Sequence, residues 1–408
     1  IQAVVVVPFL EDEPASSPAA PMLLFDDFMR PNSAPDFEQL PFDHPLFVLY
    51  SSGTTGKPKC IVHSAGGTLV QHLKELVLHT NLSSSDRIFY YTNCGWMMWN
   101  WLVSALATDA QLMLYDGSPF YPESDSLWRV VAEEQITVFG TSPGFLVASE
   151  KAGVKPNTLG VDANLHTVLS TGAPLAPESF DYVRECVGAN IRLSSISGGT
   201  DLISCFALGN PLLPVYRGEL QCPGLGMAVN VFDTDGRPLM QQSGELVCTR
   251  PFPSMPVGFW NDPDGSLYRQ AYFQRFPGVW AHGDIAEITS TGGLRIYGRS
   301  DAVLNPGGVR IGTAEVCEPV LALREVIDCL AVSQNWEGDV RIVLFVVLTD
   351  QETLTEQLKE IIRVAIRSAA SPRHVPAVIL EVPEIPRTLS GKPVELAVRA
   401  LVNGEKVE

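Results

Sequence analysis

Residues 51–59 (SSGTTGKPK) place glycines, hydroxyl side chains and two lysines in one short stretch. Small residues let backbone N–H groups approach phosphate oxygens, hydroxyls add hydrogen bonds, and Lys57 and Lys59 add positive charge. The stretch is not a Walker A loop, because the gap between its glycines is too short and the final Ser or Thr is missing. We predict a phosphate-binding loop that follows a strand and precedes a helix. The alternative is a turn that is merely rich in small residues.

Other stretches with chemical potential follow at Ser170–Pro174, Ser197–Asp201, Trp280–Asp284, Gly298–Asp301 and Pro386–Lys392. They offer hydroxyls, carboxylates, a guanidinium and an ammonium beside Gly and Pro turns. An Asp carboxylate is a hard oxygen ligand that suits Mg²⁺, and cations beside it neutralise phosphate charge. Any one of these stretches alone is more simply a turn or a solvated loop. Their order over most of the chain makes coincidence negligible.

Together these motifs resemble those of the adenylate-forming family, which includes acyl-CoA synthetases, peptide-synthetase adenylation domains and firefly luciferase. The resemblance implies that Thr200 contacts the α-phosphate of ATP and that Asp201, where most relatives have Glu, binds Mg²⁺. It also implies that Lys392 meets the reacting carboxylate and that Asp301 is a hinge. The further ATP and AMP contacts that it implies are Ser52, Gly53, Thr54, Thr55, Gly56, Lys57, Gly172, Ala173, Pro174, Gly199, Asp284, Arg299 and Arg310.

The resemblance also implies an acyl pocket made by Trp96, Met97, Met98, Thr171 and Gly198. Acetyl-CoA synthetases close this pocket with a Trp, whereas residues 196–198 here carry no such side chain, so we expect an acid longer than acetate. A Trp/Met cluster at helical spacing is otherwise typical of a core. Coenzyme A is expected to contact Gly308 and Arg367, although an Arg on a helix surface is usually only solvated.

The activity that the resemblance implies is that of an AMP-forming acid–CoA ligase. Acetoacetate, ATP and coenzyme A would give acetoacetyl-CoA, AMP and pyrophosphate through an acyl-adenylate, with Mg²⁺ as the metal. Two alternatives stay open. The acid is another small one, such as propionate, butyrate or 3-hydroxybutyrate, or the protein is an inactive nucleotide-binding fragment.

The elements that must position these residues alternate between strands and helices from Phe47 to Ser195, which predicts a parallel sheet flanked by helices. From 218 to 300, short strands divided by Gly, Pro and Asp predict a β-barrel-like subdomain. After residue 300, helices and strands predict a compact α+β unit. We therefore predict an α/β protein with a large N-terminal domain, residues 1–300, and a small mobile lid domain, residues 301–408.

Four local features complete the prediction. Residues 2–8 are expected to form a buried strand, and residues 9–44 an irregular connection. His63 and His282 are interpreted as packing or hydrogen-bonding residues. The helix after the phosphate loop is expected to bury one apolar stripe, which consists of Leu69, Leu73, Leu76 and Val77.

The formal net charge of −18 argues against a nucleic-acid or anionic-membrane partner, because both need a positive surface. The eight cysteines form no C-x-x-C pair, which favours reduced thiols in the cytosol. Residues 96–107 are too few to span a bilayer. We expect small-molecule substrates and no obligate protein partner. Family members have a substantial region before the phosphate loop, and we expect most of it, with a short C-terminal tail, to be missing here.

Overall fold

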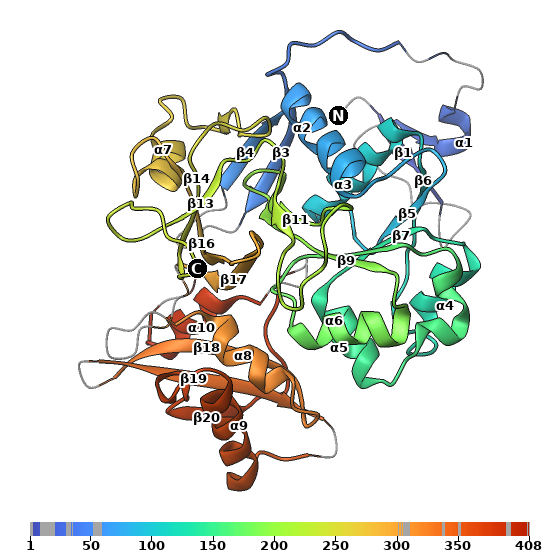
Figure 1. Ribbon diagram of the computed structural model, residues 1–408. Helices are drawn as coiled ribbons and strands as arrows, with labels where there is room; N and C mark the ends of the chain where they lie inside the picture. The colour runs from blue at the N-terminus through green and yellow to red at the C-terminus, as the bar shows by residue number, and fades with distance from the viewer. Residues whose placement is uncertain are drawn as a thin grey trace. The chain divides into compact units, whose positions relative to one another are not determined.

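The computed structural model describes residues 3–8, 21–29, 34, 36–51, 59–300, 302, 304, 311–336, 339–349, 352–388, 393–405 and 407. The chain forms two compact units, Ile1–Pro41 and Phe42–Glu408 (Figure 1). Each unit has its own secondary structure. Within the described residues, no helix combines the length and the apolar character needed to cross a membrane.

The first unit contains a parallel pair of short strands, β1 (Val4–Val6) and β2 (Met22–Leu24), and the helical turn α1 (Phe25–Phe28). The expected strand is present but shorter, and it is not buried, since Val5 and Val7 are 36% and 62% exposed. Two three-residue strands have too little apolar surface to cover each other's side chains. The expectation that residues 9–44 are irregular was wrong for 22–28, where β2 and α1 lie, whereas the described residues 34 and 36–44 contain no helix or strand.

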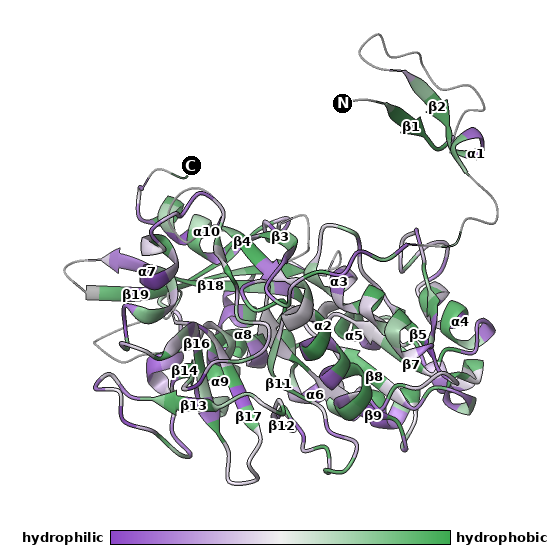
Figure 2. Cartoon of the chain, turned by 90° about the horizontal axis from the view of Figure 1, so that it is seen from above, coloured by the Kyte–Doolittle hydropathy of each residue, from purple (hydrophilic) through white to green (hydrophobic). Residues whose placement is uncertain are grey.

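The centre of the second unit is a parallel sheet in the order β6–β5–β7–β8–β9. This confirms the sheet predicted from the alternating pattern. Valine, isoleucine, leucine and phenylalanine fill its inner strands, as expected for strands covered on both faces (Figure 2). The strands are β5 (Arg87–Tyr90), β6 (Gln111–Met113), β7 (Val138–Thr141), β8 (Thr167–Ser170) and β9 (Arg192–Ser195).

Helices cover both faces of this sheet. One face packs against α4 (Ser126–Glu133), α5 (Pro143–Lys151), α6 (Pro177–Tyr182) and its continuation η5 (Val183–Val187). Phe139 and Trp128 lie in this cluster, with ring centroids 5.1 Å apart. The other face packs against α3 (Met97–Ser104) and residues of η1 (Lys74–His79). Short helical turns complete the region, namely η2 (Ala105–Thr108), η3 (Pro156–Leu159) and η4 (Val161–Ala163).

The predicted apolar stripe of the helix after the phosphate loop was right for Leu76, which is fully buried, and wrong for Leu69 and Val77. This helix is α2 (Ala65–Leu73), continued by η1, and Leu69 and Val77 are 44% and 43% exposed. Its buried face is instead mostly polar and contains Thr68, Gln71, His72, Glu75 and His79. Two of them, His72 and His79, bind backbone carbonyls of Ile203 and Gly209.

The predicted phosphate loop joins two antiparallel strands, β3 (Pro45–Ser51) and β4 (Lys59–Ser64). The expected helix does not follow the loop directly, because the apolar run Cys60–Val62 forms a strand first. The short strand β15 (Gly258–Phe259) pairs with the other edge of β4. A second small antiparallel sheet has the order β10 (Ser197–Gly199), β11 (Ser204–Leu208) and β12 (Cys222–Pro223).

Residues 218–300 are β-rich, as predicted, and form an antiparallel sheet in the order β13–β14–β16–β17. Its strands are β13 (Val229–Phe232), β14 (Gly244–Cys248), β16 (Trp280–Ile288) and β17 (Leu294–Arg299). Among the described residues this order has two edges, so the sheet is open rather than a closed ring. Helix α7 (Ser266–Phe273) packs against β16.

The residues after Leu304 have hydrophobic clusters of their own. They form a sheet in the order β18 (Val326–Trp336), β19 (Asp339–Leu348) and β20 (Val378–Glu381). Helices α8 (Thr313–Leu321) and α9 (Glu356–Ala369) supply residues to one cluster, and α10 (Glu395–Val402) to the other. The turn η7 (Pro372–His374) precedes β20. The arrangement is the α+β unit that the sequence predicts.

Candidate active site

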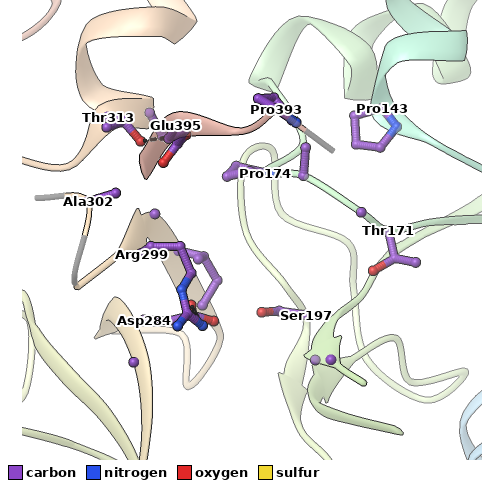
Figure 3. A pocket seen from close by; sticks show the side chains of 18 of the residues that line it. Pro143, Thr171, Pro174, Ser197, Asp284, Arg299, Ala302, Thr313, Pro393 and Glu395 are labelled. Atoms are coloured by element: carbon purple, nitrogen blue, oxygen red, sulfur yellow. Dashed lines mark hydrogen bonds and ion pairs between the residues drawn. The ribbon is translucent and has the colours of Figure 1, made fainter. Parts of the chain in front are cut away.

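A large cleft, of about 2890 Å³, brings together most of the predicted site residues that the structure describes. Single small-molecule pockets are usually about 300–1,000 Å³, so the cleft has room for more than one substrate. In Figure 3, Asp284 and Arg299 lie on one side, opposite Thr171, Pro174 and Ser197. The predicted residues that line the cleft are Trp96, Met97, Met98, Thr171, Gly172, Ala173, Pro174, Gly198, Gly199, Thr200, Asp201, Asp284 and Arg299.

Asp284 and Arg299 are cross-strand partners on β16 and β17. The Arg299 guanidinium donates to Asp284 Oδ1 over 3.4 Å, and the Asp284 residue is only 8% exposed. Gly283 precedes Asp284 with φ +84°, and a Cβ there would lie 2.9 Å from Arg299 Nη2. A glycine is therefore required for the close approach of the arginine. The pair offers a carboxylate acceptor and a cation side by side at the cleft wall.

Glu245 on β14 binds the residues next to this pair, Gly283 and Ser300, and was not predicted from the sequence. Its Oε1 accepts hydrogen bonds from the Gly283 N–H at 3.1 Å and from the Ser300 hydroxyl at 3.0 Å, and Arg275 pairs with its Oε2. Burial raises the pKa of Glu245, against the lowering effect of Arg275. An isolated Gly-Glu-Leu in a β-rich region gives no signal for such a role.

Thr200 and Asp201 lie in the turn between β10 and β11. Lys59 Nζ is 3.4 Å from Asp201 Oδ1, and the Tyr272 hydroxyl donates to the same oxygen over 2.6 Å. Burial alone would raise the pKa of Asp201, but Lys59, His282, the Tyr272 hydrogen bond and Arg299 outweigh it and lower that pKa. Asp201 is therefore an ionised carboxylate at the cleft surface.

Two buried histidines hold the same turn from behind. His63 Nε2 donates to the Thr200 carbonyl over 2.9 Å, and His72 Nε2 donates to the Ile203 carbonyl over 2.6 Å. Burial lowers the pKa of His63 to about 4 and also lowers the pKa of His72, so both rings are neutral near pH 7. The interpretation of His63 as a hydrogen-bonding residue agrees with this geometry.

His282 lines the cleft between the two carboxylates. Its Nε2 lies 3.6 Å from Asp284 Oδ2, and its ring meets Phe206 edge to face with centroids 4.9 Å apart. Burial lowers the pKa of His282 although both Asp284 and Asp201 oppose that shift. The packing that the sequence analysis assigned to it is present.

The turn 171–174 follows β8 and faces the Trp/Met wall of α3. The Thr171 hydroxyl donates to the Ile196 carbonyl over 2.7 Å, which ties the ends of β8 and β9 together. Gly172 has φ +109°, and a Cβ there would lie 3.5 Å from the Trp96 ring. Trp96 and Met97 are partly buried, and Met98 packs into the core at 3% exposure. These three side chains therefore pack in the hydrophobic core and also line the cleft.

Gly198 does not open the acyl pocket in the way the sequence suggested. A Cβ at Gly198 would overlap the Ser204 carbonyl oxygen and the Cα of Cys205, because β10 and β11 approach closely there. The backbone of Gly198 lines the cleft, but its missing side chain faces β11. Packing between strands accounts for this glycine, and a large residue there would disrupt the sheet rather than fill a pocket.

Several predicted site residues lie outside the described residues, namely Ser52, Gly53, Thr54, Thr55, Gly56, Lys57, Asp301, Gly308, Arg310 and Lys392. The described ends of their segments, Lys59, Ala302 and Pro393, all line the cleft. Arg367 lies exposed in the last turn of α9 and is not among the residues that line the cleft.

The described residues fit a magnesium ion that arrives with its nucleotide. No group of three or more His, Cys, Asp or Glu side chains among them is arranged to hold a metal. Mg²⁺ usually binds through one or two carboxylates, with substrate phosphates and water supplying the rest of its shell. Asp201 supplies such a carboxylate, because Tyr272 and Lys59 contact its Oδ1 and no hydrogen bond from the described residues reaches its Oδ2.

The family of the chain follows from comparison with known proteins. The model of the family described as AMP-binding enzyme matches residues 4–257, so the chain belongs to that family. The chain is 56% identical over 407 residues to acetoacetyl-coenzyme A synthetase of Rhizobium meliloti (strain 1021), covering 99% of this chain and 63% of that protein. It is 50% identical over 417 residues to acetoacetyl-CoA synthetase of Gallus gallus, covering 100% of this chain and 62% of that protein.

A solved structure agrees with these sequence matches. Acetoacetyl-CoA synthetase from Streptomyces lividans superposes with a TM-score of 0.90 at 47% identity, covering 98% of this chain and 61% of that chain. The likeness therefore extends over both the sheet-bearing part of the chain and the α+β unit. The chain spans just over three fifths of the length of these relatives.

Proposed function

We propose that the protein is an AMP-forming acid–CoA ligase that joins acetoacetate to coenzyme A. The observation that carries the proposal is one cleft lined by the 171–174 turn, the Thr200–Asp201 turn and the Asp284–Arg299 pair. The relatives named acetoacetyl-CoA synthetase, at 47–56% identity over nearly the whole of this chain, support the choice of acid. ATP and coenzyme A are the other substrates, and the cytosol is the proposed compartment.

In the first half-reaction, the acetoacetate carboxylate attacks the α-phosphorus of ATP and pyrophosphate leaves. Asp284 accepts hydrogen bonds from the ribose hydroxyls, Arg299 contacts the same sugar, and residues 172–174 face the adenine. Thr200 donates to the α-phosphate. Asp201 would be the protein ligand of a magnesium ion bound with ATP, and such an ion would supply positive charge against the phosphates. The protein's own contribution is positioning and electrostatic stabilisation.

In the second half-reaction, the CoA thiol attacks the acyl carbonyl of the adenylate and AMP leaves. We propose that residues 301–408 form a lid that turns about Asp301 between the two steps. The separate hydrophobic clusters after Leu304 support such a boundary. Lys392 serves the first step, and Gly308 and Arg367 serve the second.

The proposal is tested by acid-dependent exchange of labelled pyrophosphate into ATP, on the longest form of the protein that its gene encodes. We expect exchange with acetoacetate to exceed exchange with acetate, propionate, butyrate or 3-hydroxybutyrate. A higher kcat/KM for another of these acids would correct the substrate. ATP binding without exchange for any acid would instead favour an inactive nucleotide-binding protein.

The role of Lys392 is tested by separating the half-reactions. Lys392→Ala is expected to abolish pyrophosphate exchange while thioester formation from supplied acetoacetyl-adenylate stays close to the wild-type rate. Arg387→Ala is the matched control, since Arg387 is a nearby cation in the sequence and lines the cleft. Equal loss of both half-reactions in Lys392→Ala would show that the assignment is wrong.

A further inference from the structure

Tyr272 is a cleft residue that neither the motifs nor the proposed roles account for. It lies on α7, which follows β15, and the residue is only 2% exposed. Its hydroxyl reaches across to the turn after β10 and donates to Asp201 Oδ1 over 2.6 Å. Bonds from a neutral donor to a carboxylate are short and strong at such distances.

The ring of Tyr272 is held rigidly. It stacks on Trp280 with centroids 3.7 Å apart and an interplanar angle of 11°. The helix that carries it is anchored at its start, because Asp262 accepts from the backbone N–H groups of Leu267 and Tyr268. A rigid donor fixes the orientation of the group that it binds, so Asp201 has little freedom to rotate.

Asp201 Oδ1 has a second partner of a different kind. Lys59 Nζ lies 3.4 Å from this oxygen and 5.1 Å from the centre of the Tyr272 ring. Lys59 ends the predicted phosphate loop, so the several negative charges of a triphosphate in the cleft would attract it away from a single carboxylate. The neutral Tyr272 hydroxyl is not attracted in that way. It therefore keeps Oδ1 bonded when Lys59 turns to the nucleotide.

With Oδ1 held, Oδ2 is the oxygen that remains for a cation. It lies beside the backbone of Gly199 in the cleft lining, where a Cβ would stand 3.7 Å from Oδ2 and 3.6 Å from the His282 ring. We propose that Tyr272 is a positioning residue for Asp201, which fixes Oδ1 so that Oδ2 faces the magnesium ion of MgATP. This inference rests on the proposed function, because it needs MgATP in the cleft.

The test measures how ATP affinity depends on free Mg²⁺, by calorimetric titration of ATP into the longest form of the protein that its gene encodes. Tyr272→Phe removes the hydroxyl and keeps the ring on Trp280. We expect this variant to need about tenfold more Mg²⁺ for half of the full gain in ATP affinity, the order expected for one lost bond to a charged group. Its affinity for metal-free ATP should equal that of the wild type.

Tyr268→Phe is the matched control, because Tyr268 lies one turn earlier on α7 with its ring centroid 5.3 Å from that of Tyr272. It should leave the Mg²⁺ requirement unchanged. If Tyr272→Phe does not fold, Tyr272→His is used instead, because the shorter histidine side chain also removes the hydrogen bond to Asp201 Oδ1. An unchanged Mg²⁺ requirement, or an equal shift in Tyr268→Phe, would overturn the inference alone. A wild-type protein that binds ATP with no dependence on Mg²⁺ would overturn the proposed function with it.

Discussion

Two buried regions on opposite sides of the central sheet are equally inaccessible to water and chemically unlike. Beneath α4, α5 and α6 the side chains are apolar, with Leu127, Trp128 and Phe139 at 0% exposure. Beneath α2 and η1 lies a polar seam, formed by Gln71, His72, Glu75 and His79, which are 0–2% exposed. Burial of the apolar region is therefore stabilised by the area removed from water, and burial of the polar seam by hydrogen bonds.

The polar seam packs against backbone carbonyls that are not hydrogen-bonded within a strand or helix. The turn between β10 and β11 and the loop after β11 expose carbonyls of Ile203 and Gly209, which His72 and His79 bind at 2.6 and 2.7 Å. A buried carbonyl without a donor would cost about 1–3 kcal/mol. A helix packed on irregular backbone therefore needs buried donors and acceptors, whereas a helix packed on a sheet needs apolar volume.

The largest effect is expected from Glu75→Leu. Glu75 accepts hydrogen bonds from Gln71 at 2.9 Å, from Trp101 at 3.0 Å and from Ser204. Leucine leaves these donors and the ammonium of Lys74 without their buried acceptor. We expect a loss of about 3–5 kcal/mol in the free energy of unfolding, measured by urea denaturation.

The neighbouring residue supplies the matched control for that variant. Leu76 is 0% exposed and belongs to the apolar cluster under α3. Leu76→Ala should lose about 2–5 kcal/mol through a cavity, and Leu76→Ile much less. If Glu75→Leu were as stable as the wild type, hydrogen bonds would not stabilise the polar seam, and the two buried regions would not differ in this respect.

A smaller effect, but one on activity, is expected from His72→Leu. The change removes the donor to Ile203, two residues beyond Asp201 in the same turn. We expect about 1–3 kcal/mol less stability and a larger fall in kcat than in ATP affinity for pyrophosphate exchange. His166→Leu is the control, because its half-exposed ring pairs with Asp86 at 3.0 Å, far along the chain from the turn. Equal kinetic effects of both variants would contradict a role for the seam in holding the turn.

The apolar side of this comparison was predictable from the sequence, and the polar side was not. Strands such as Val138–Thr141, between turn residues, identify a sheet by composition alone, and the structure confirms it. The motif order also selected residues that meet in one cleft, including Thr171, Asp201 and Asp284. Strand composition is a local property of the sequence, and the motifs contain side chains whose chemistry few other residue types provide.

The predictions that failed, and the residues that were missed, depend on what lies opposite in three dimensions. Leu69 and Val77 fit a helical stripe, but the sequence does not show that the buried face of α2 meets carbonyls. Gly198 was interpreted as an open wall, whereas the approach of β11 explains it. Glu245 and Tyr272 lie in unremarkable stretches, and only their partners, Ser300 and Asp201, reveal a role.

Acidification should destabilise the folded protein through His63, the β4 histidine that binds the Thr200 carbonyl. The pKa of this ring is about 4 in the folded protein, because burial disfavours its charged form, against an ordinary value of 6.5. The unfolded chain therefore takes up the proton first as pH falls. The stability contributed by neutral His63 is complete above pH 6.5 and is lost between pH 6.5 and 4. From about pH 7.5 to 5 the wild type should lose roughly 2 kcal/mol more than His63→Gln in urea denaturation. A constant difference between the two proteins over that range would contradict the assignment.

Glu318 on α8 should show the opposite dependence, with an effect of similar size, because none of the described residues donates a hydrogen bond to its carboxyl. Burial, and then the charges of Glu178 and Glu315, raise the pKa of Glu318 to about 7 from 4.5, against the lowering effect of Arg295. The folded protein therefore holds a proton between those values that the unfolded chain has lost, so stability falls as pH rises from 4.5 to 7. Glu318→Gln removes this dependence, and its free energy of unfolding relative to the wild type should rise by about 2–3 kcal/mol from pH 5 to pH 8. Glu360→Gln, on the more exposed surface of α9, should show no such rise. A relative stability of Glu318→Gln that fell as pH rose would show instead that donors bind the ionised Glu318 carboxylate.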